Sequence, residues 1–249
     1  WTGDVPLFDL NGKDYLVFRD FVAGYNGTEA AATAADRRVV FYGNAQASSH
    51  CVFENLKVKN YGATANTLHG VFWVGGTLGA ITNSVIRDIY ASGLANFGLV
   101  IRDCQDTRIE NVRVFGAPSY ACAAFEDDGI YLPKFGASEH VRVRDCQVVG
   151  FGGVGIYIGG SYVIVDGNRV ESCIEWGIYV TNGGVRCVVS KNWVEGCSTS
   201  GSFADGIAIY IVGDDARVSD NYAVVMNNTA GAGAYVAGLA LNAARCLAT

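Results

Sequence analysis

The chain has 249 residues, and its 18 lysines and arginines are outnumbered by 24 aspartates and glutamates, for a formal net charge of −6. Because phosphate binding needs a basic stripe, this balance argues against nucleic acid as a partner. No run of about 18 apolar residues occurs, so we expect no membrane-spanning helix.

One short phrase recurs through the last 180 residues: a glycine, an aliphatic residue, a variable residue and a second apolar residue. Its copies begin 22 to 32 residues apart. They are Gly70–Trp73, Gly98–Ile101, Gly129–Leu132, Gly155–Ile158, Gly177–Val180, Gly206–Ile209 and Gly238–Leu241. Strand-like segments at such a period are typical of a solenoid, in which each turn packs only on its neighbours.

A second phrase has an apolar residue at each end and mostly polar residues between. Its copies are Val17–Val22, Phe53–Val58, Ile81–Ile86, Ile109–Val114, Val143–Val148, Val165–Val170, Val189–Val194 and Val218–Ala223. Glycine, asparagine and aspartate separate the two phrases, as turn residues do. Each turn of the solenoid therefore carries two short strands and no helix.

These repeats resemble the right-handed parallel β-helix superfamily, which includes pectate lyases, polygalacturonases, chondroitinase B and phage tailspikes. The resemblance covers roughly residues 7 to 245. It implies an all-β fold, a parallel β-helix of about eight coils. We interpret residues 1–249 as a single domain of this kind and expect it to be part of a larger polypeptide.

The repeat also places side chains of one type in register. Asn168, Asn192 and Asn221 occupy the same position in successive coils, which predicts a structural ladder of stacked amides. Cys173 and Cys197 also align in successive coils, so we expect their side chains to lie about one strand spacing apart. Most of the eight cysteines are interpreted as buried thiols.

The middle residue of each glycine phrase should point outward when its neighbours point inward. This row reads Phe72, Val100, Tyr131, Tyr157, Tyr179, Ala208 and Ala240. Its three consecutive tyrosines predict an aromatic wall on which sugar rings stack, with Trp176 and Arg102 at nearby strand ends as further carbohydrate contacts. A subunit interface and simple aromatic packing are the alternatives.

Carboxylates gather directly before one of the glycines. Glu126, Asp127 and Asp128 precede Gly129, and adjacent carboxylates are favoured where they hold a cation or perform acid–base chemistry. Asp127 and Glu175 share a register two coils apart, about 10 Å, near the upper limit for an inverting carboxylate pair. The alternative is a set of solvated acids at turn starts.

Two enzyme patterns of the superfamily are similar in part to these residues. Polygalacturonases carry four elements on successive coils, and only Asp127–Ile130 matches one of them. Chondroitinase B and alginate lyases are similar in the order of an asparagine, an acidic pair and a lysine. That resemblance implies Asn96, Glu126 and Asp128 as calcium ligands and Lys134 as the base that removes a uronate proton. The arginine of that pattern is missing from its coil, and Arg102 is the nearest basic residue.

We therefore expect an extracellular or surface-associated domain that binds a polysaccharide and carries a lyase-like or glycosidase-like site. Its catalytic candidates are Asp127, Asp128, Lys134 and Glu175. The alternative is a non-catalytic rod of a phage tail, virion or cell surface, assembled as a trimer. In that case loops 26–36 and 198–204 are contact elements.

Overall fold

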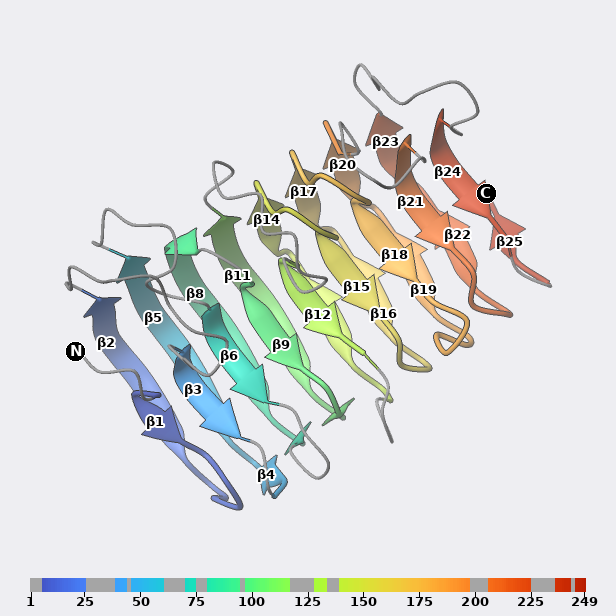
Figure 1. Cartoon of the computed structure of the whole chain (residues 1–249). Coiled ribbons are helices and arrows are strands. Elements are labelled where there is room, and N and C mark those ends of the chain that lie inside the picture. Colours follow the sequence, from blue (N-terminus) through green and yellow to red (C-terminus); the bar gives the residue numbers. More distant parts are fainter. Residues whose placement is uncertain are drawn as a thin grey trace.

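The computed structural model describes residues 6–25, 39–43, 46–60, 70–74, 80–94, 97–116, 128–133, 139–197, 206–224, 236–242 and 245–249. Every regular element in these ranges is a strand, and every pairing between strands is parallel. Figure 1 shows the strands stacked along one axis, from β1 and β2 near the N-terminus to β24 and β25 near the C-terminus. The chain is thus a parallel β-helix in which each coil lies directly on the previous one.

One face of the β-helix is a nine-stranded sheet that contains the glycine phrases. Its strands, in spatial and in chain order, are β1 (Phe8–Asp9), β3 (Val39–Gly43), β6 (Gly70–Val74), β9 (Leu99–Ile101), β12 (Ile130–Leu132), β15 (Ile156–Ile158), β18 (Ile178–Val180), β21 (Gly206–Ile211) and β24 (Val236–Leu241). Consecutive strands of this sheet belong to consecutive coils, so each outward row runs along the axis.

The second phrase forms a thirteen-stranded sheet. Its first four strands are long: β2 (Val17–Tyr25), β5 (Val52–Asn60), β8 (Val85–Leu94) and β11 (Arg108–Gly116). Later coils divide each long strand into two short ones: β13 (Arg142–Arg144) and β14 (Gln147–Val149), β16 (Ile164–Asp166) and β17 (Arg169–Glu171), β19 (Val188–Ser190) and β20 (Trp193–Glu195), β22 (Arg217–Ser219) and β23 (Tyr222–Val224), and finally β25 (Leu247–Ala248) alone. A third, three-stranded sheet joins β4 (Ser48–Ser49), β7 (Ile81–Thr82) and β10 (Cys104–Gln105).

Sharp turns between the strands close the cross-section of each coil. The corner within the second phrase holds one residue per coil in the left-handed region, with φ near +50° to +70°: Asp20, Asn55, Asp88, Asn111, Asp145, Gly167, Lys191 and Asp220. Aspartate, asparagine and glycine tolerate this conformation better than other residues, which explains the polar centre of the phrase.

The interior is filled by the alternate residues of every strand. In β12, for example, Ile130 and Leu132 are buried while Tyr131 between them is partly exposed. Phenylalanines Phe41, Phe53 and Phe72 fill the first coils, and valines and isoleucines fill the later ones. Because the core is closed by these stacked side chains, any binding function has to lie on the outside.

The predicted asparagine ladder is confirmed. Asn168 Nδ2 donates to Asn192 Oδ1 at 2.9 Å, and Asn192 Nδ2 donates to Asn221 Oδ1 at 2.9 Å. Each amide also donates to a backbone carbonyl and accepts a hydrogen bond from a backbone N–H of the preceding coil. Cys146 takes the next position and ends the ladder, because its backbone N–H donates to Asn168 Oδ1.

Two coils depart from the register that the glycine phrase predicts. In β6, Phe72 is buried and Trp73 occupies the outward row, since Trp73 pairs with Tyr42 and Val100. In β21, Ala208 is buried and Tyr210 pairs with Tyr179. The assignment of Phe72 and Ala208 to the outward row is therefore wrong.

Two copies of the second phrase differ from the predicted register. The first copy begins at Phe18 and not at Val17, because Phe18 pairs with Phe53 and both Val17 and Val22 are exposed. Ile81 lies in the three-stranded sheet, and Ile86 is the residue that pairs with Phe53. The copy in this coil therefore begins five residues later, at Ile86. Ile81 of the short strand β7 resembles the start of the phrase because it precedes Ile86 by five residues, the spacing of the two apolar ends of the phrase.

Candidate functional site

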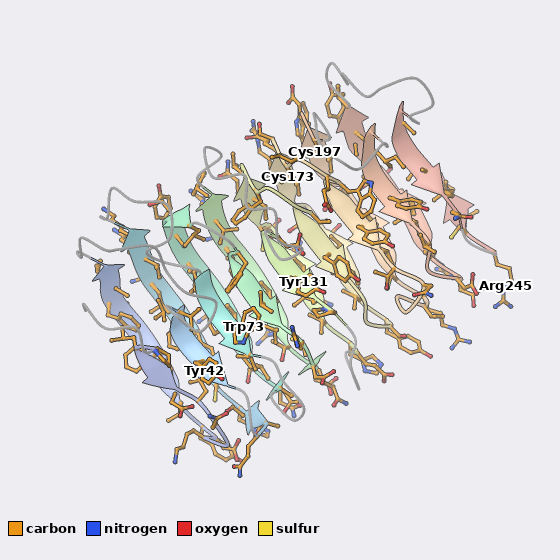
Figure 2. The ribbon with its side chains drawn as sticks, in the orientation of Figure 1. Tyr42, Trp73, Tyr131, Cys173, Cys197 and Arg245 are labelled. Atoms are coloured by element: carbon orange, nitrogen blue, oxygen red, sulfur yellow. The ribbon has the colours of Figure 1, made fainter. Side chains whose placement is uncertain are left out.

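The outward row of the nine-stranded sheet is the most distinctive external feature of the described residues. In register from one end to the other, its members are Asp9, Tyr42, Trp73, Val100, Tyr131, Tyr157, Tyr179, Tyr210 and Ala240. We call this set the aromatic row. Figure 2 shows Tyr42, Trp73 and Tyr131 on successive parts of this face.

Four consecutive tyrosines form the C-terminal half of the row. The ring centroids are 4.5 Å apart for Tyr131 and Tyr157, 5.3 Å for Tyr157 and Tyr179, and 5.3 Å for Tyr179 and Tyr210. The ring planes of the last pair are nearly parallel, at 12°, whereas the first pair is tilted by 52° and the second is edge-to-face at 84°. All four side chains are half-buried. The predicted stacking of Tyr131, Tyr157 and Tyr179 is confirmed, and Tyr210 extends it by one coil.

Trp176 widens the row beside its last two tyrosines. Its ring lies 4.5 Å from that of Tyr179 and 5.6 Å from that of Tyr210. Trp176 precedes Gly177, whose lack of a β-carbon allows a close approach between sheets: a methyl group there would lie 2.1 Å from Val194 Cγ1. The glycine phrase therefore brings Trp176 against the tyrosines as well as positioning Tyr179.

The N-terminal half of the row is packed differently. Tyr42 and Val100 are buried in a small cluster with Val39 and Phe97, against which Trp73 and Tyr131 also pack. The Trp73 ring lies 5.1 Å from Phe97 and under the Arg102 guanidinium, with Arg102 Cζ 5.4 Å from its centroid. Arg102 is thus held by a cation–π contact at the edge of the row. It contacts Trp73, which the sequence pattern had not placed there.

Burial raises the pKa of two tyrosine hydroxyls in the row, those of Tyr157 and Tyr179. The pKa of Tyr157 is raised well above its usual value, mainly by burial and further by Tyr131, Tyr179 and Asp128. The pKa of Tyr179 is raised by burial and by Tyr210. Both hydroxyls can therefore donate and accept hydrogen bonds across the physiological pH range.

Asp128 is the one member of the acidic cluster that lies among the described residues. It is 4% exposed, and its Oδ1 accepts a hydrogen bond of 2.6 Å from the backbone N–H of Val154 in the next coil. This carboxylate thus ties two coils together at the start of β12, beside Tyr157, whose pKa it influences. This hydrogen bond gives the Asp128 carboxylate a structural role between the two coils.

Glu175 is half-buried at the start of the coil that carries Trp176 and Tyr179. Burial raises the pKa of its carboxyl above the usual glutamate value. Its backbone N–H donates to the carbonyl of Gly153 at 3.2 Å, so it aligns with residue 153 of the preceding coil. A carboxyl with a raised pKa beside an aromatic surface has the properties of a general acid.

The remaining predicted residues lie outside the described part of the chain: Asn96, Glu126, Asp127 and Lys134, together with loops 26–36 and 198–204. Their positions relative to Asp128 and Glu175 stay predictions, and so does the calcium site. Within the ranges that the structure describes, no group of three histidine, cysteine, aspartate or glutamate side chains is arranged to hold a metal ion.

The sequence pattern missed Tyr42, Trp73 and Tyr210 as members of the aromatic row. Trp73 lies one residue, and Tyr210 two residues, after the position predicted from the glycine phrase. The coil of Tyr42 has no glycine phrase. The signal that finds them is the alternation of buried and partly exposed residues along each strand, aligned between coils by apolar positions.

Comparison with known families agrees with this architecture. The family model described as "Right handed beta helix region" matches residues 44–194 and 98–247. The chain therefore belongs to the right-handed β-helix family, as its repeats predicted. No curated protein and no solved structure matches it. In the part of the chain that is described, no helix is long and apolar enough to cross a membrane.

Proposed function

We propose that the chain binds a polysaccharide along the aromatic row, outside the cell or on a virion or cell surface. The observation that carries this proposal is the uninterrupted register of Tyr131, Tyr157, Tyr179 and Tyr210, flanked by Trp176. Four coils at about 4.8 Å each extend over about 14 Å, a length suited to a short stretch of a linear sugar polymer.

The chemistry of the row fits sugars for two reasons. Aromatic faces pack against the apolar faces of sugar rings, and half-buried tyrosine hydroxyls supply hydrogen bonds at the same surface. Tyrosine hydroxyls are neutral near pH 7, and burial raises the pKa of Tyr157 and Tyr179 further, so these two impose no negative charge on an acidic sugar. Arg102 beside Trp73 is a candidate contact for a uronate carboxylate.

Cleavage of the bound polymer is the finer part of the proposal. Glu175 is the candidate general acid, because its raised pKa keeps a larger fraction of the carboxyl protonated near neutral pH. In a lyase-like reaction, Lys134 would remove the proton next to a uronate carboxylate, and Asn96, Glu126 and Asp128 would hold calcium against that carboxylate. In a hydrolase-like reaction, Asp127 or Asp128 would act opposite Glu175.

Binding is tested by screening the protein against neutral and uronate polysaccharides, with and without calcium, and measuring affinity by calorimetry for any polymer that binds. We expect Tyr157→Ala and Tyr179→Ala each to weaken binding about tenfold. Tyr222→Ala is the matched control, because Tyr222 is an exposed tyrosine on the thirteen-stranded sheet. Equal affinity of all three variants, or no binding to any polymer, would contradict the proposal.

Cleavage is followed in the same screen by the absorbance of unsaturated products and by reducing ends. Glu175→Gln should leave affinity unchanged and abolish product formation if Glu175 is the acid. The rival function, a non-catalytic trimeric rod, predicts instead a trimer in light scattering that Tyr157→Ala dissociates, with no affinity for sugar.

A further inference from the structure

Cys173 and Cys197 occupy equivalent positions in two consecutive coils. Cys173 lies two residues after the end of β17, and Cys197 lies two residues after the end of β20. These two strands are paired, with Glu171 opposite Glu195. The pairing continues beyond the strands, because Ser172 N donates to the carbonyl of Glu195 at 3.1 Å. Figure 2 shows the two cysteines next to each other on this side of the β-helix.

The surroundings of the two sulfur atoms are the same. Cys173 Sγ lies 3.6 Å from the carbonyl oxygen of Glu171, and Cys197 Sγ lies 3.6 Å from that of Glu195. A methyl group on Gly155 would lie 3.2 Å from Cys173 Sγ, and one on Gly177 would lie 3.3 Å from Cys197 Sγ. Both side chains therefore point the same way into the core, and one sulfur lies over the other.

The pKa values of the two thiols depend on each other. The Cys197 side chain, ahead of burial, raises the pKa of Cys173 well above its usual value, and the Cys173 side chain lowers that of Cys197. Both residues are fully buried, and their equivalent positions in paired coils place one side chain over the other.

The other cysteines that the structure describes have different neighbours. Cys146 lies between Val112 and Asn168, and Cys187 lies between Val163 and Ala216. Among the described cysteines, Cys173 and Cys197 alone occupy equivalent positions in adjacent coils.

We propose that Cys173 and Cys197 form an intrachain disulfide that joins two consecutive coils when the chain folds in the presence of a disulfide oxidant such as oxidised glutathione. One cysteine thiolate attacks a sulfur of the oxidant, forms a mixed disulfide and releases one glutathione thiolate. The second cysteine thiolate then attacks the protein sulfur of the mixed disulfide and releases the other. The two protein thiols lose two electrons and two protons, and one oxidised glutathione becomes two reduced glutathiones.

The geometry suits this bond. Neighbouring parallel strands are separated by about 4.8 Å, within the range of about 4.4 to 6.8 Å between α-carbons that a disulfide allows. The closed core keeps an oxidant away from both thiols once the coils have packed. The cross-link therefore forms during folding or during transient opening of these coils, and afterwards the same burial protects it from reductants.

The test compares full-length protein refolded with oxidised and reduced glutathione to protein refolded with reductant alone. Each sample is denatured in N-ethylmaleimide, and the mass gives the number of alkylated thiols. We expect eight alkylated cysteines in the reduced sample and six in the oxidised one, with a peptide map joining Cys173 to Cys197. The oxidised protein should melt about 5–10 °C higher, as expected for a loop of this length in a chain of this size.

Cys187→Ala is the matched control, because it removes a buried cysteine whose neighbours in the adjacent coils are Val163 and Ala216, and it should still yield the cross-link. Cys173→Ala and Cys197→Ala should each abolish it. If either of these two variants fails to fold, the wild-type peptide map alone decides. Eight alkylated thiols after oxidative refolding, or a disulfide between any other two cysteines, would overturn the proposal. Sugar binding enters none of these readouts, so the outcome is independent of the proposed function.

Discussion

The asparagine ladder allows a quantitative prediction for the variant Asn192→Ala. Asn192 is 1% exposed and makes four side-chain hydrogen bonds. Its Oδ1 accepts from the backbone N–H of Asn168 at 3.0 Å and from Asn168 Nδ2 at 2.9 Å, while its Nδ2 donates to Val165 O at 3.0 Å and Asn221 Oδ1 at 2.9 Å. The substitution removes all four at once.

The cost follows from what each partner keeps. Asn168 Nδ2 still donates to Val143 O, and Asn221 Oδ1 still accepts from the backbone N–H of Asn192. The backbone N–H of Asn168 loses its acceptor inside the core, which costs about 1–3 kcal/mol. The other three bonds contribute about 0.5–1.5 kcal/mol each. We therefore expect Asn192→Ala to lower the free energy of unfolding by about 3–7 kcal/mol.

Urea unfolding followed by circular dichroism measures this loss. Asn221→Ala should cost less, because Asn221 is only partly buried and water can replace part of its hydrogen bonding. Asn242→Ala is the surface control, since its exposed side chain makes one long hydrogen bond to Tyr210, and it should change stability by less than about 0.5 kcal/mol. If Asn192→Ala were no more destabilising than Asn242→Ala, the ladder would not stabilise the core.

Two further substitutions test the structure. Cys146→Asn should be tolerated and extend the ladder by one coil, because the new amide would lie near Asn168 Oδ1 and near the carbonyl of Ile109, which Cys146 Sγ already contacts at 3.6 Å. A crystal structure and an unchanged or raised urea midpoint would check this prediction. A loss of stability of more than about 2 kcal/mol would refute it. Glu175 has a raised pKa in the folded chain, so it favours folding below the usual glutamate pKa and loses that contribution as pH rises through the raised value. Glu175→Gln should therefore stabilise the protein above the raised pKa and flatten the pH dependence of stability between the usual glutamate pKa and the raised one, whereas an unchanged pH profile would contradict the assignment.

The sequence predicted the fold well because a solenoid repeats its local rules in every coil. Tyr131, Tyr157 and Tyr179 were placed correctly, since the glycine before each stands where a β-carbon has no room. The rule failed at β21, where Ala208 stands level with Gly177 and Gly206 lies two residues earlier. Glycine indicates the register only in coils where a neighbouring strand comes too close for a β-carbon. The alternation of buried and exposed residues indicates the register in every coil.

The candidate site was harder to predict for a different reason. Outward positions carry no packing constraint that repeats from coil to coil, so their roles depend on neighbours that a repeat does not specify. Asp128 illustrates this point: its place before Gly129 suggested chemistry, yet its carboxylate is buried and bonded to the backbone of the next coil. Trp176, in contrast, lies against Tyr179 of its own coil, and the pairing of Tyr179 with Tyr210 brings Tyr210 close to it as well.

The two outer faces differ in a way that favours binding at the aromatic row. On the thirteen-stranded sheet, the outward row through Arg19, Glu54, Arg87, Glu110, Arg144 and Asp166 alternates in charge. Ion pairs join Arg19 to Glu54 at 3.3 Å and Arg144 to Asp166 at 3.5 Å. Such a row is suited to contact with water. The equivalent row on the nine-stranded sheet carries half-buried tyrosines and a tryptophan. The thirteen-stranded sheet also carries an exposed aromatic pair, Trp193 and Tyr222, whose rings stack at 4.0 Å. The proposed binding at the aromatic row therefore predicts that variants of Tyr157 and Tyr179 lose affinity, whereas variants of Trp193 and Tyr222 keep it.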